Sequence, residues 1–273
     1  MTCTLITGYY EVKSKFNREQ YMSWARTYLS LKSPIVLFTE EYMVSTIKEL
    51  RGDKPIHIII LPFHELDTWK LYKDKWIAHH DMDPEKSAHS PELYAVWAQK
   101  AFFVEHAISI NPFSTEFFFW CDIGAFRNSD IDPIILSTFP STRYMEPNRM
   151  LFQSLGDVKS SDKVKKSDGI YGEVISNEWN EIRIVGGLWG GGMNACLQWK
   201  HAYQNMLERY FDANRFAGKD QQVMFSTILE NLDIVKVVRF TNYSIDMWFF
   251  LEYLLSDRDE SYLEDTTYNL IIN

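Results

Sequence analysis

Short apolar runs alternate with segments of helical periodicity along the first third of the chain. Residues 4–7, 34–38 and 56–61 are runs of strand length that are rich in Ile, Leu and Val. Residues 17–29 and 42–50, which lie between these runs, repeat apolar side chains at helical spacing. This alternation of strand and helix predicts βαβ units and a parallel sheet.

The apolar run Phe117–Cys121 leads directly into Asp122, and Gly124 follows two residues later. A continuous apolar run of this length predicts a strand that is buried on both faces. Because open α/β sheets bind ligands at the carboxyl ends of their strands, we expect Asp122 at the rim of a crevice. There its carboxylate could accept a hydrogen bond from a ribose hydroxyl or hold a metal that bridges a diphosphate. The alternative is an Asp that only caps the following turn.

A long helix is predicted just before this strand, from Ser90 as the cap and Pro91 as the first residue to about Ile108. Its inward stripe contains Leu93, Val96, Trp97, Lys100, Val104 and Ala107. A buried ammonium is costly unless it is paired. Lys100 therefore extends its head to the surface, pairs with a nearby carboxylate, or faces an anionic ligand.

Five of the 12 glycines lie within residues 182–192, around Trp189. The spacing matches neither a phosphate-binding P-loop nor a dinucleotide fingerprint. We expect a strand followed by a glycine-lined wall, where a sugar ring stacks on the indole and reaches backbone amides. The residues assigned to this wall are Gly186, Gly187, Trp189 and Gly190. The alternative is a glycine-rich turn with Trp189 in the core.

Residues 219–225 have the pattern of a helix start, with Asp220 as the N-cap. The alternative role of Asp220 is a carboxylate that faces the reacting sugar, with Gln221 as a hydrogen-bonding neighbour. Further along, Asp246 and Trp248 could form a closing edge of the site. Ordinary surface and core positions are the alternative for these two residues.

Composition limits the function classes. The chain has 273 residues, 46% of them hydrophobic, a net charge of −9 and a pI near 5.3. This charge argues against a nucleic-acid partner, which would require clustered Lys and Arg. The three cysteines are widely spaced and indicate neither a disulfide framework nor a zinc site, as expected in the cytoplasm. The start of the chain does not read as a targeting segment, and no apolar run has membrane-spanning length, although association with a membrane surface stays open.

Three segments together resemble the HtrL/YibB-like proteins, a family akin to GT-A-type glycosyltransferases. They are His89–Lys100 (HSPELYAVWAQK), Asn111–Thr115 (NPFST) and Phe119–Arg127 (FWCDIGAFR). The resemblance implies one GT-A-like α/β domain with a Rossmann-like mixed, mostly parallel sheet flanked by helices. Residues 1–125 would form its nucleotide-binding half and residues 126–273 its sugar and acceptor half.

The same resemblance implies transfer of a sugar from a nucleotide-sugar donor to a hydroxyl of a glycan or glycoconjugate acceptor. A UDP-hexose is the commonest donor among similar enzymes. Asp122 would stand in place of the usual Asp-x-Asp motif, and Asp220 and Asp122 would be the catalytic carboxylates. The nucleotide sugar would be bound by Lys100, Asp122 and Gly124, and its nucleobase by a loop made of Thr7, Gly8, Tyr9 and Tyr10. Gln221 and Trp248 would contact the sugar or the acceptor.

The sequence departs from the Asp-x-Asp pattern at Gly124. Residues two apart in an extended segment point the same way, so the glycine removes the second carboxylate that a divalent ion would meet. Literal Asp-x-Asp triplets occur at 81–83, 130–132 and 257–259, but none follows an apolar strand. Mn²⁺ or Mg²⁺ would therefore be held by Asp122 with diphosphate oxygens, helped by Asp220 or Asp246. Metal dependence stays open.

Two other function classes remain. A non-catalytic sugar- or nucleotide-binding protein would use the same aromatic residues and glycines. A metal-dependent hydrolase could be built on His79, His80, Asp81, Asp83 and His89, because imidazoles and carboxylates bind transition metals. Their spacing matches no defined metal motif, and we expect them to lie in a polar loop as solvated side chains.

Overall fold

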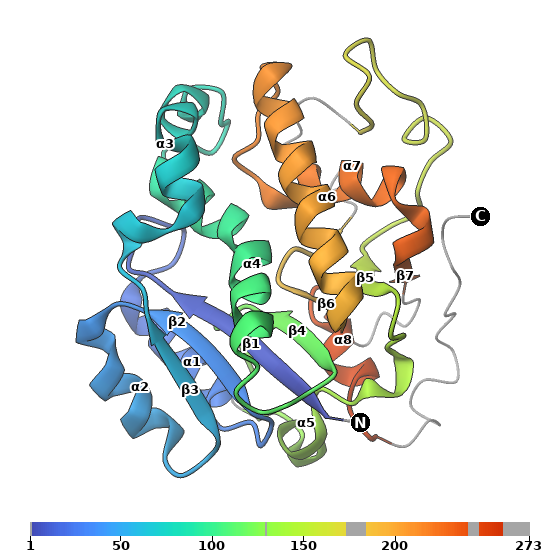
Figure 1. The fold of residues 1–273 in the computed structure, drawn as a ribbon. Coiled ribbons are helices and arrows are strands. Elements are labelled where there is room, and N and C mark those ends of the chain that lie inside the picture. The colour runs from blue at the N-terminus through green and yellow to red at the C-terminus, as the bar shows by residue number, and fades with distance from the viewer. Residues whose placement is uncertain (1, 129, 173–183, 240–245, 259–273) are drawn as a thin grey trace.

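Seven strands form one mixed sheet in the computed structural model, which describes residues 2–128, 130–172, 184–239 and 246–258 (Figure 1). The strands are β1 Cys3–Tyr9, β2 Ile35–Thr39, β3 Ile56–Ile60, β4 Phe117–Cys121, β5 Met150–Ser154, β6 Leu188–Gly192 and β7 Val235–Arg239. Their order is β3-β2-β1-β4-β6-β5-β7. All neighbours are parallel except that β6 runs antiparallel to both β4 and β5. The predicted mixed, mostly parallel sheet is confirmed.

Helices cover both faces of the sheet, and each face has its own hydrophobic core. The helices are α1 Arg18–Tyr28, α2 Val44–Arg51, α3 Asp67–His80, α4 Pro91–Ile110, α5 Pro133–Thr138, α6 Met193–Asp212, α7 Asp220–Glu230 and α8 Phe250–Leu254. Residues of α3, α4, α6 and α7 build one core, and residues of α1, α2, α5 and α8 build the other. Figure 1 shows α4 and α6 lying across the front of the sheet. The predicted helix from Pro91 is confirmed.

The middle of the sheet places the candidate chemistry. Strands β1 and β4 are parallel neighbours, and Ile6 is level with Trp120. Every residue of β4 is buried, because aromatic side chains fill both faces of this central strand. The carboxyl ends of parallel neighbours meet at one edge of the sheet. The chain therefore leaves β4 at Asp122 on the edge where β1 also ends.

Two strand boundaries differ from the prediction. The first strand does not end with Thr7 but continues to Tyr9, because Thr7, Gly8 and Tyr9 pair with β2. The expected loop from Thr7 to Tyr10 is therefore mostly strand. The glycine run also becomes a strand, β6, which lies between β4 and β5. A side chain at Gly190 would collide with the backbone of Phe118, so this glycine serves close strand packing and not a ligand.

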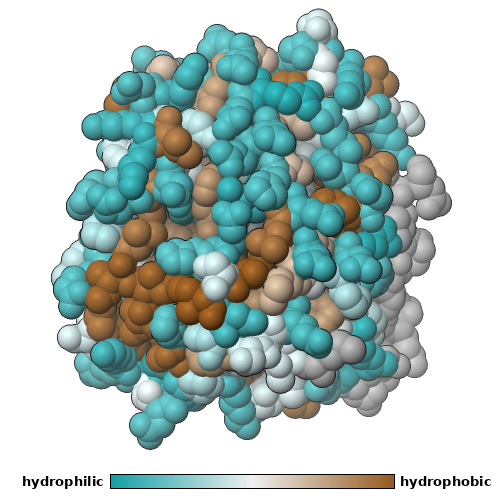
Figure 2. Space-filling view, in the orientation of Figure 1, coloured by the Kyte–Doolittle hydropathy of each residue, from teal (hydrophilic) through white to brown (hydrophobic). Residues whose placement is uncertain are grey.

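An apolar surface lies along the edge strand β3, whose side chains are only partly buried. Figure 2 shows hydrophobic side chains gathered on the side of the molecule where Figure 1 places this strand. Ile60 is 48% exposed there. Over the described ranges of the chain, none of the helices combines the length and apolarity that crossing a membrane requires.

Candidate functional site

Lys100 of α4 lies at the centre of a charged cluster with Asp122 and Asp220. Its side chain is only 7% exposed, so the ammonium does not extend to the surface. The ammonium Nζ lies 3.2 Å from Oδ1 of Asp122 and 2.8 Å from Oδ2 of Asp220. It also donates a hydrogen bond of 3.0 Å to the carbonyl oxygen of Gly186. Of the three roles considered for Lys100, pairing with a carboxylate is the one the structure shows.

Asp122 is the exposed member of this cluster. Its side chain is 41% exposed at the end of β4, which is the predicted position at the edge of the sheet. The indole Nε1 of Trp120 donates a 2.6 Å hydrogen bond to Oδ1, and the backbone N–H of Asp122 donates to the carbonyl of Gly187 at 2.8 Å. The carboxylate is thus held in place and keeps an open side toward solvent.

Asp220 is the buried member, with a side chain that is 8% exposed. It is the first residue of α7, and the N-cap is Lys219, so the capping prediction for Asp220 is wrong. Its Oδ2 makes a 2.8 Å ion pair with the ammonium of Lys100 and has no further hydrogen-bond partner among the described residues. Asp220 can therefore still accept a hydrogen bond.

The cluster carries one more negative charge than positive charge. Burial disfavours the charged form of Lys100, but the carboxylates of Asp122 and Asp220 outweigh it and raise the pKa of the ammonium. Burial raises the pKa of Asp220, and the pairing with Lys100 opposes this shift. One ammonium cannot neutralise two carboxylates, so the site favours a group that develops positive charge or donates a hydrogen bond.

Two glycines of the predicted wall lie against these carboxylates. A β-carbon on Gly187 would lie 2.9 Å from Oδ2 of Asp122, and one on Gly186 would lie 3.0 Å from Oδ1 of Asp220. Both positions therefore need glycine for the carboxylates to lie where they do. Gln221 is a neighbour of Gly186, and its side-chain amide donates to the carbonyl of Ile184 at 3.0 Å.

The predicted nucleobase loop is not formed by the side chains assigned to it. Thr7, Tyr9 and Tyr10 are buried, and the Tyr10 ring stacks on Phe103 at a centroid distance of 6.0 Å. At Gly8 a β-carbon would lie 3.1 Å from the Phe103 ring. Tyr10 packs in the core on one face of the sheet and Tyr9 in the core on the other, because the strand continues further than the sequence indicated.

Gly124 also has a packing role. A β-carbon there would lie 3.0 Å from the Trp24 ring and 3.3 Å from the Tyr21 ring, so the glycine lets α1 approach the turn after Asp122.

The turn after Asp122 also carries an exposed cation, Arg127, that the sequence did not point to. The Arg127 guanidinium donates to the Gly124 carbonyl and lies 4.5 Å from the centre of the Trp24 ring.

Trp189 is a core residue, as the alternative prediction stated. It is 2% exposed and lies between the rings of Trp120 and Trp199, with both centroid distances at 6.4 Å. A sugar cannot stack on this indole from solvent, so the predicted stacking on Trp189 is wrong.

Trp248 is half-buried and packs against the core on the α1 face, and its role stays a prediction. Asp246 is exposed and accepts a hydrogen bond from the backbone of Trp248.

The histidine-rich segment forms a structural network and not a metal centre. His79 and His80 end α3 and do not lie in a polar loop. Asp83 accepts hydrogen bonds of 2.7 Å from both His89 and Tyr94, and all three side chains are buried. Among the residues that the structure describes, no three His, Cys, Asp or Glu side chains are placed to hold a metal ion. The hydrolase alternative therefore lacks its site in this part of the chain.

The comparisons with known proteins agree with the resemblance seen in the sequence. A family model described as a bacterial protein of unknown function (HtrL_YibB) matches residues 1–137. The chain belongs to this family. Protein HtrL of Escherichia coli (strain K12) is 23% identical over 229 residues, which are 75% of this chain and 75% of that protein.

Two solved structures are among those with some similarity to this HtrL_YibB family member. Mouse xyloside xylosyltransferase 1 in its apo form is 12% identical with a TM-score of 0.47, covering 87% of this chain and 85% of that one. Core-mannan synthase A (CmsA/Ktr4) from Aspergillus fumigatus in its Mn/GDP form is 9% identical with a TM-score of 0.47, covering 87% and 72%.

Proposed function

We propose that this protein is a glycosyltransferase that moves a sugar from a nucleotide-sugar donor to a hydroxyl of a glycan or glycoconjugate. One observation carries the proposal. The half-exposed carboxylate of Asp122 stands where two parallel strands end, and buried Lys100 ties it to a second carboxylate, Asp220. Ligands bind at this edge of open α/β sheets, and paired carboxylates serve reactions at an anomeric carbon.

In the proposed reaction the bond between the anomeric carbon and the diphosphate oxygen breaks, and a bond to the acceptor oxygen forms. The diphosphate leaves with the electron pair, and the acceptor hydroxyl gives its proton to a base. Positive charge grows on the sugar as the bond breaks, and the excess negative charge of Asp122 and Asp220 stabilises it. In this proposal Asp220, whose pKa is raised by burial, is the base that takes the proton.

Lys100 acts in this proposal as the residue that positions the carboxylates. We expected it to face the diphosphate, but both of its near carboxylates already compete for its charge. Arg127 is exposed on the turn that follows Asp122, and its pairing with the Gly124 carbonyl fixes its direction. We assign the diphosphate to Arg127, because a guanidinium binds phosphate oxygens through two parallel hydrogen bonds.

A divalent ion fits this site through one protein ligand. Asp122 has an open side, but the ammonium of Lys100 occupies the space between Asp122 and Asp220. Mg²⁺ and Mn²⁺ bind through one carboxylate when phosphate oxygens and water complete the coordination. Asp122 would hold Mn²⁺ or Mg²⁺, which would offset the charge of the diphosphate.

The finer assignments are part of the same proposal. We take a UDP-hexose as the donor to test first, and we divide the single domain into a nucleotide-binding half, residues 1–125, and a sugar and acceptor half, residues 126–273. The alternative is a sugar- or nucleotide-binding protein without catalysis. It would bind the same ligands and release no nucleoside diphosphate.

The test is the release of nucleoside diphosphate from a panel of nucleotide sugars, measured with and without acceptors, and in Mn²⁺ or in chelator. Asp122→Asn should lower turnover at least about a thousandfold while leaving the melting temperature nearly unchanged, because the lost charge acts in the transition state. Asp53→Asn, at an exposed position, is the matched control.

The outcomes separate the alternatives. Near-normal turnover by Asp122→Asn would remove the site assignment. Tight binding of a nucleotide sugar without turnover would favour the binding protein. Equal turnover in chelator and in Mn²⁺ would remove the metal.

A further inference from the structure

Trp120 of β4 contacts two members of the charged cluster with one indole. Its Nε1 donates the 2.6 Å hydrogen bond to Oδ1 of Asp122, and Nζ of Lys100 lies 5.9 Å from the centre of its ring. At this distance the face of an indole attracts a cation. The sequence indicated Trp120 only as part of a buried strand. In the structure it holds both a carboxylate and the ammonium that pairs with that carboxylate.

The direction of the Trp120 N–H is fixed by the rings that stack on this indole. The Phe103 ring lies at a centroid distance of 5.8 Å and an angle of 8°, and the Trp189 ring at 6.4 Å and 25°. They reach Trp120 from opposite neighbours of β4, because Phe103 packs on Gly8 of β1 and Trp189 belongs to β6. The Trp120 side chain is only 3% exposed. A close-packed indole of this kind has no room to turn its N–H elsewhere.

The two oxygens of Asp122 differ in how many protein groups they already meet. Oδ1 accepts the hydrogen bond from Trp120 and also lies 3.2 Å from the ammonium of Lys100. Oδ2 meets the same ammonium only through a long hydrogen bond of 3.4 Å. Each oxygen of a carboxylate can accept about two hydrogen bonds. Oδ1 is therefore occupied by the protein, whereas Oδ2 keeps capacity for a further partner.

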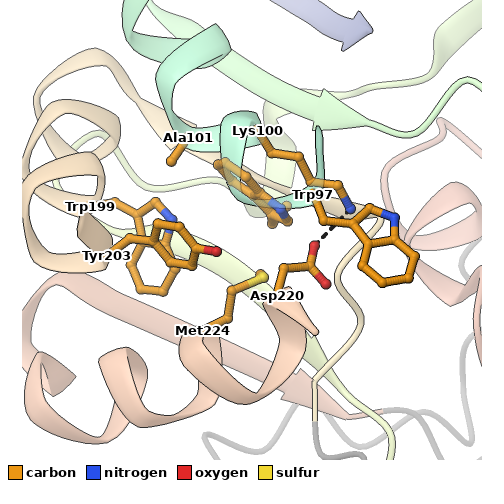
Figure 3. A pocket seen from close by; sticks show the side chains of 8 residues that line it. Trp97, Lys100, Ala101, Trp199, Tyr203, Asp220 and Met224 are labelled. Atoms are coloured by element: carbon orange, nitrogen blue, oxygen red, sulfur yellow. Dashed lines mark ion pairs between the residues drawn. The ribbon is translucent and has the colours of Figure 1, made fainter. Parts of the chain in front are cut away.

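The surroundings of Asp122 preserve this difference. A β-carbon on Gly187 would lie 2.9 Å from Oδ2, so the glycine keeps a side chain away from the less occupied oxygen. The ammonium of Lys100 is held from its other side by Asp220 at 2.8 Å. Figure 3 shows Lys100 and Asp220 facing each other beside a small pocket. Because Lys100 is shared in this way, it cannot move fully onto Oδ2.

We propose that Trp120 is a positioning residue, whose N–H occupies Oδ1 of Asp122 and so presents Oδ2 to the transferred sugar. The inference rests on the proposed glycosyltransferase function. A carboxylate that rotated freely would have to be oriented during the reaction. A fixed one has its negative charge in place before positive charge grows on the anomeric carbon, which makes the contact effective in the transition state. Trp120 is buried, so it acts on the sugar only through Asp122.

The test removes the Trp120 N–H and keeps the ring system. Replacing the indole by benzothiophene puts a sulfur atom where the N–H was, so the stacking on Phe103 and Trp189 is retained. We expect kcat on the preferred donor to fall about 10- to 100-fold, as for the loss of one hydrogen bond to a charged group. KM for the donor should stay within about twofold, because the contact acts in the transition state.

The same replacement at Trp189 is the matched control. Trp189 belongs to the same stack, and its Nε1 has no hydrogen-bond partner among the described residues. Its kcat should equal that of wild type. A second comparison uses Asp122→Ala, which has no oxygen to accept the hydrogen bond. In that variant the replacement at Trp120 should cause no further loss of the residual turnover. Melting temperatures of all these proteins establish that they fold.

The possible results separate positioning from packing. Unchanged kcat after the replacement at Trp120, or a rise in KM alone, would overturn the inference, while the glycosyltransferase function would stand. An equal loss at Trp189, or an equal loss in Asp122→Ala, would also overturn it, because the indole would then act through packing. If wild type releases no nucleoside diphosphate from any nucleotide sugar, the proposed function fails and this inference fails with it.

Discussion

Two charged clusters in this protein differ in how many of their hydrogen-bonding groups have a partner within the protein. In the first, Asp83 accepts hydrogen bonds from His89, Tyr94 and the backbone N–H of Glu85, all between 2.7 and 2.8 Å. Its oxygens are occupied by protein groups, and its side chain is fully buried. A cluster closed in this way has no capacity left for a ligand, so its role is to hold the segment between α3 and α4.

The second cluster, Lys100 with Asp122 and Asp220, is left open. It carries unbalanced negative charge and its Asp122 is 41% exposed. Among the residues that the structure describes, two indole N–H groups and one phenol hydroxyl near its Asp220 have no hydrogen-bond partner. Both clusters contain the residue types that catalysis uses, and the residue types alone do not separate them. We take the second cluster as the functional one because some of its hydrogen-bonding groups lack a protein partner and one of its carboxylates reaches solvent.

Removing the cation of the open cluster should have the largest effect. Lys100→Met leaves two carboxylates without a cation to pair with, and breaking a buried ion pair costs about 3–5 kcal/mol. We expect a loss of this size in urea unfolding, together with loss of turnover. Lys48→Met, at an exposed position of α2, is the control and should change little.

A second substitution sharpens this prediction. Asp220→Asn added to Lys100→Met removes the uncompensated buried charge, so part of the lost stability should return while turnover stays absent. A loss below about 1 kcal/mol for Lys100→Met would mean that the charges are solvated. The contrast between the two clusters would then not hold.

The sequence predicted the open cluster better than its surroundings. The positions of Asp122 and Lys100 follow from local pattern, because an apolar run locates a strand end and a lysine in an apolar stripe needs a partner. Residues of the glycine run were harder to interpret. A glycine that admits a neighbouring strand, as Gly190 does, has the same sequence as one that admits a ligand.

Other parts of the site depend on tertiary contacts that no local pattern encodes. Helix α3 was missed because charged and aromatic residues alternate along it without an apolar stripe. Trp199, Tyr203 and Asp220 lie around one small pocket only because α6 packs beside α7. Periodicity showed where side chains would be buried, but it could not show which buried polar atoms would lack a partner.

The next effect tests geometry at the open cluster without removing any charge. The β-carbon of Gly187→Ala would lie 2.9 Å from Oδ2 of Asp122 and should push the carboxylate aside. A displacement of a catalytic group by about 1 Å costs roughly a hundredfold in turnover. Stability should change by less than about 1 kcal/mol, because the displaced side chain is partly exposed.

Gly156→Ala is the control for this variant, since a β-carbon there meets no atom within 4 Å. Turnover and unfolding should be measured on both proteins. Unchanged turnover in Gly187→Ala would show that the reaction does not depend on where Asp122 points, and the catalytic assignment would lose its support.

The smallest effect concerns the closed cluster and falls on stability alone. Burial raises the pKa of Asp83, but the hydrogen bonds from His89, Tyr94 and the Glu85 backbone outweigh it and lower the pKa from 3.8 to about 2. A folded pKa below the unfolded value stabilises the protein above about pH 4, and this contribution is lost as pH falls toward 2. Asp83→Asn should therefore cost about 2 kcal/mol at pH 7 and progressively less below pH 4.

Urea unfolding at several pH values, with Asp81→Asn as the exposed neighbour, measures this directly, because the Asp81 side chain is 89% exposed. Turnover of folded Asp83→Asn should match wild type, since the closed cluster has no free group to offer a substrate. If this variant instead lost turnover at full stability, Asp83 would belong to the reaction. The number of hydrogen-bond partners within the protein would then no longer distinguish a structural charged side chain from a functional one.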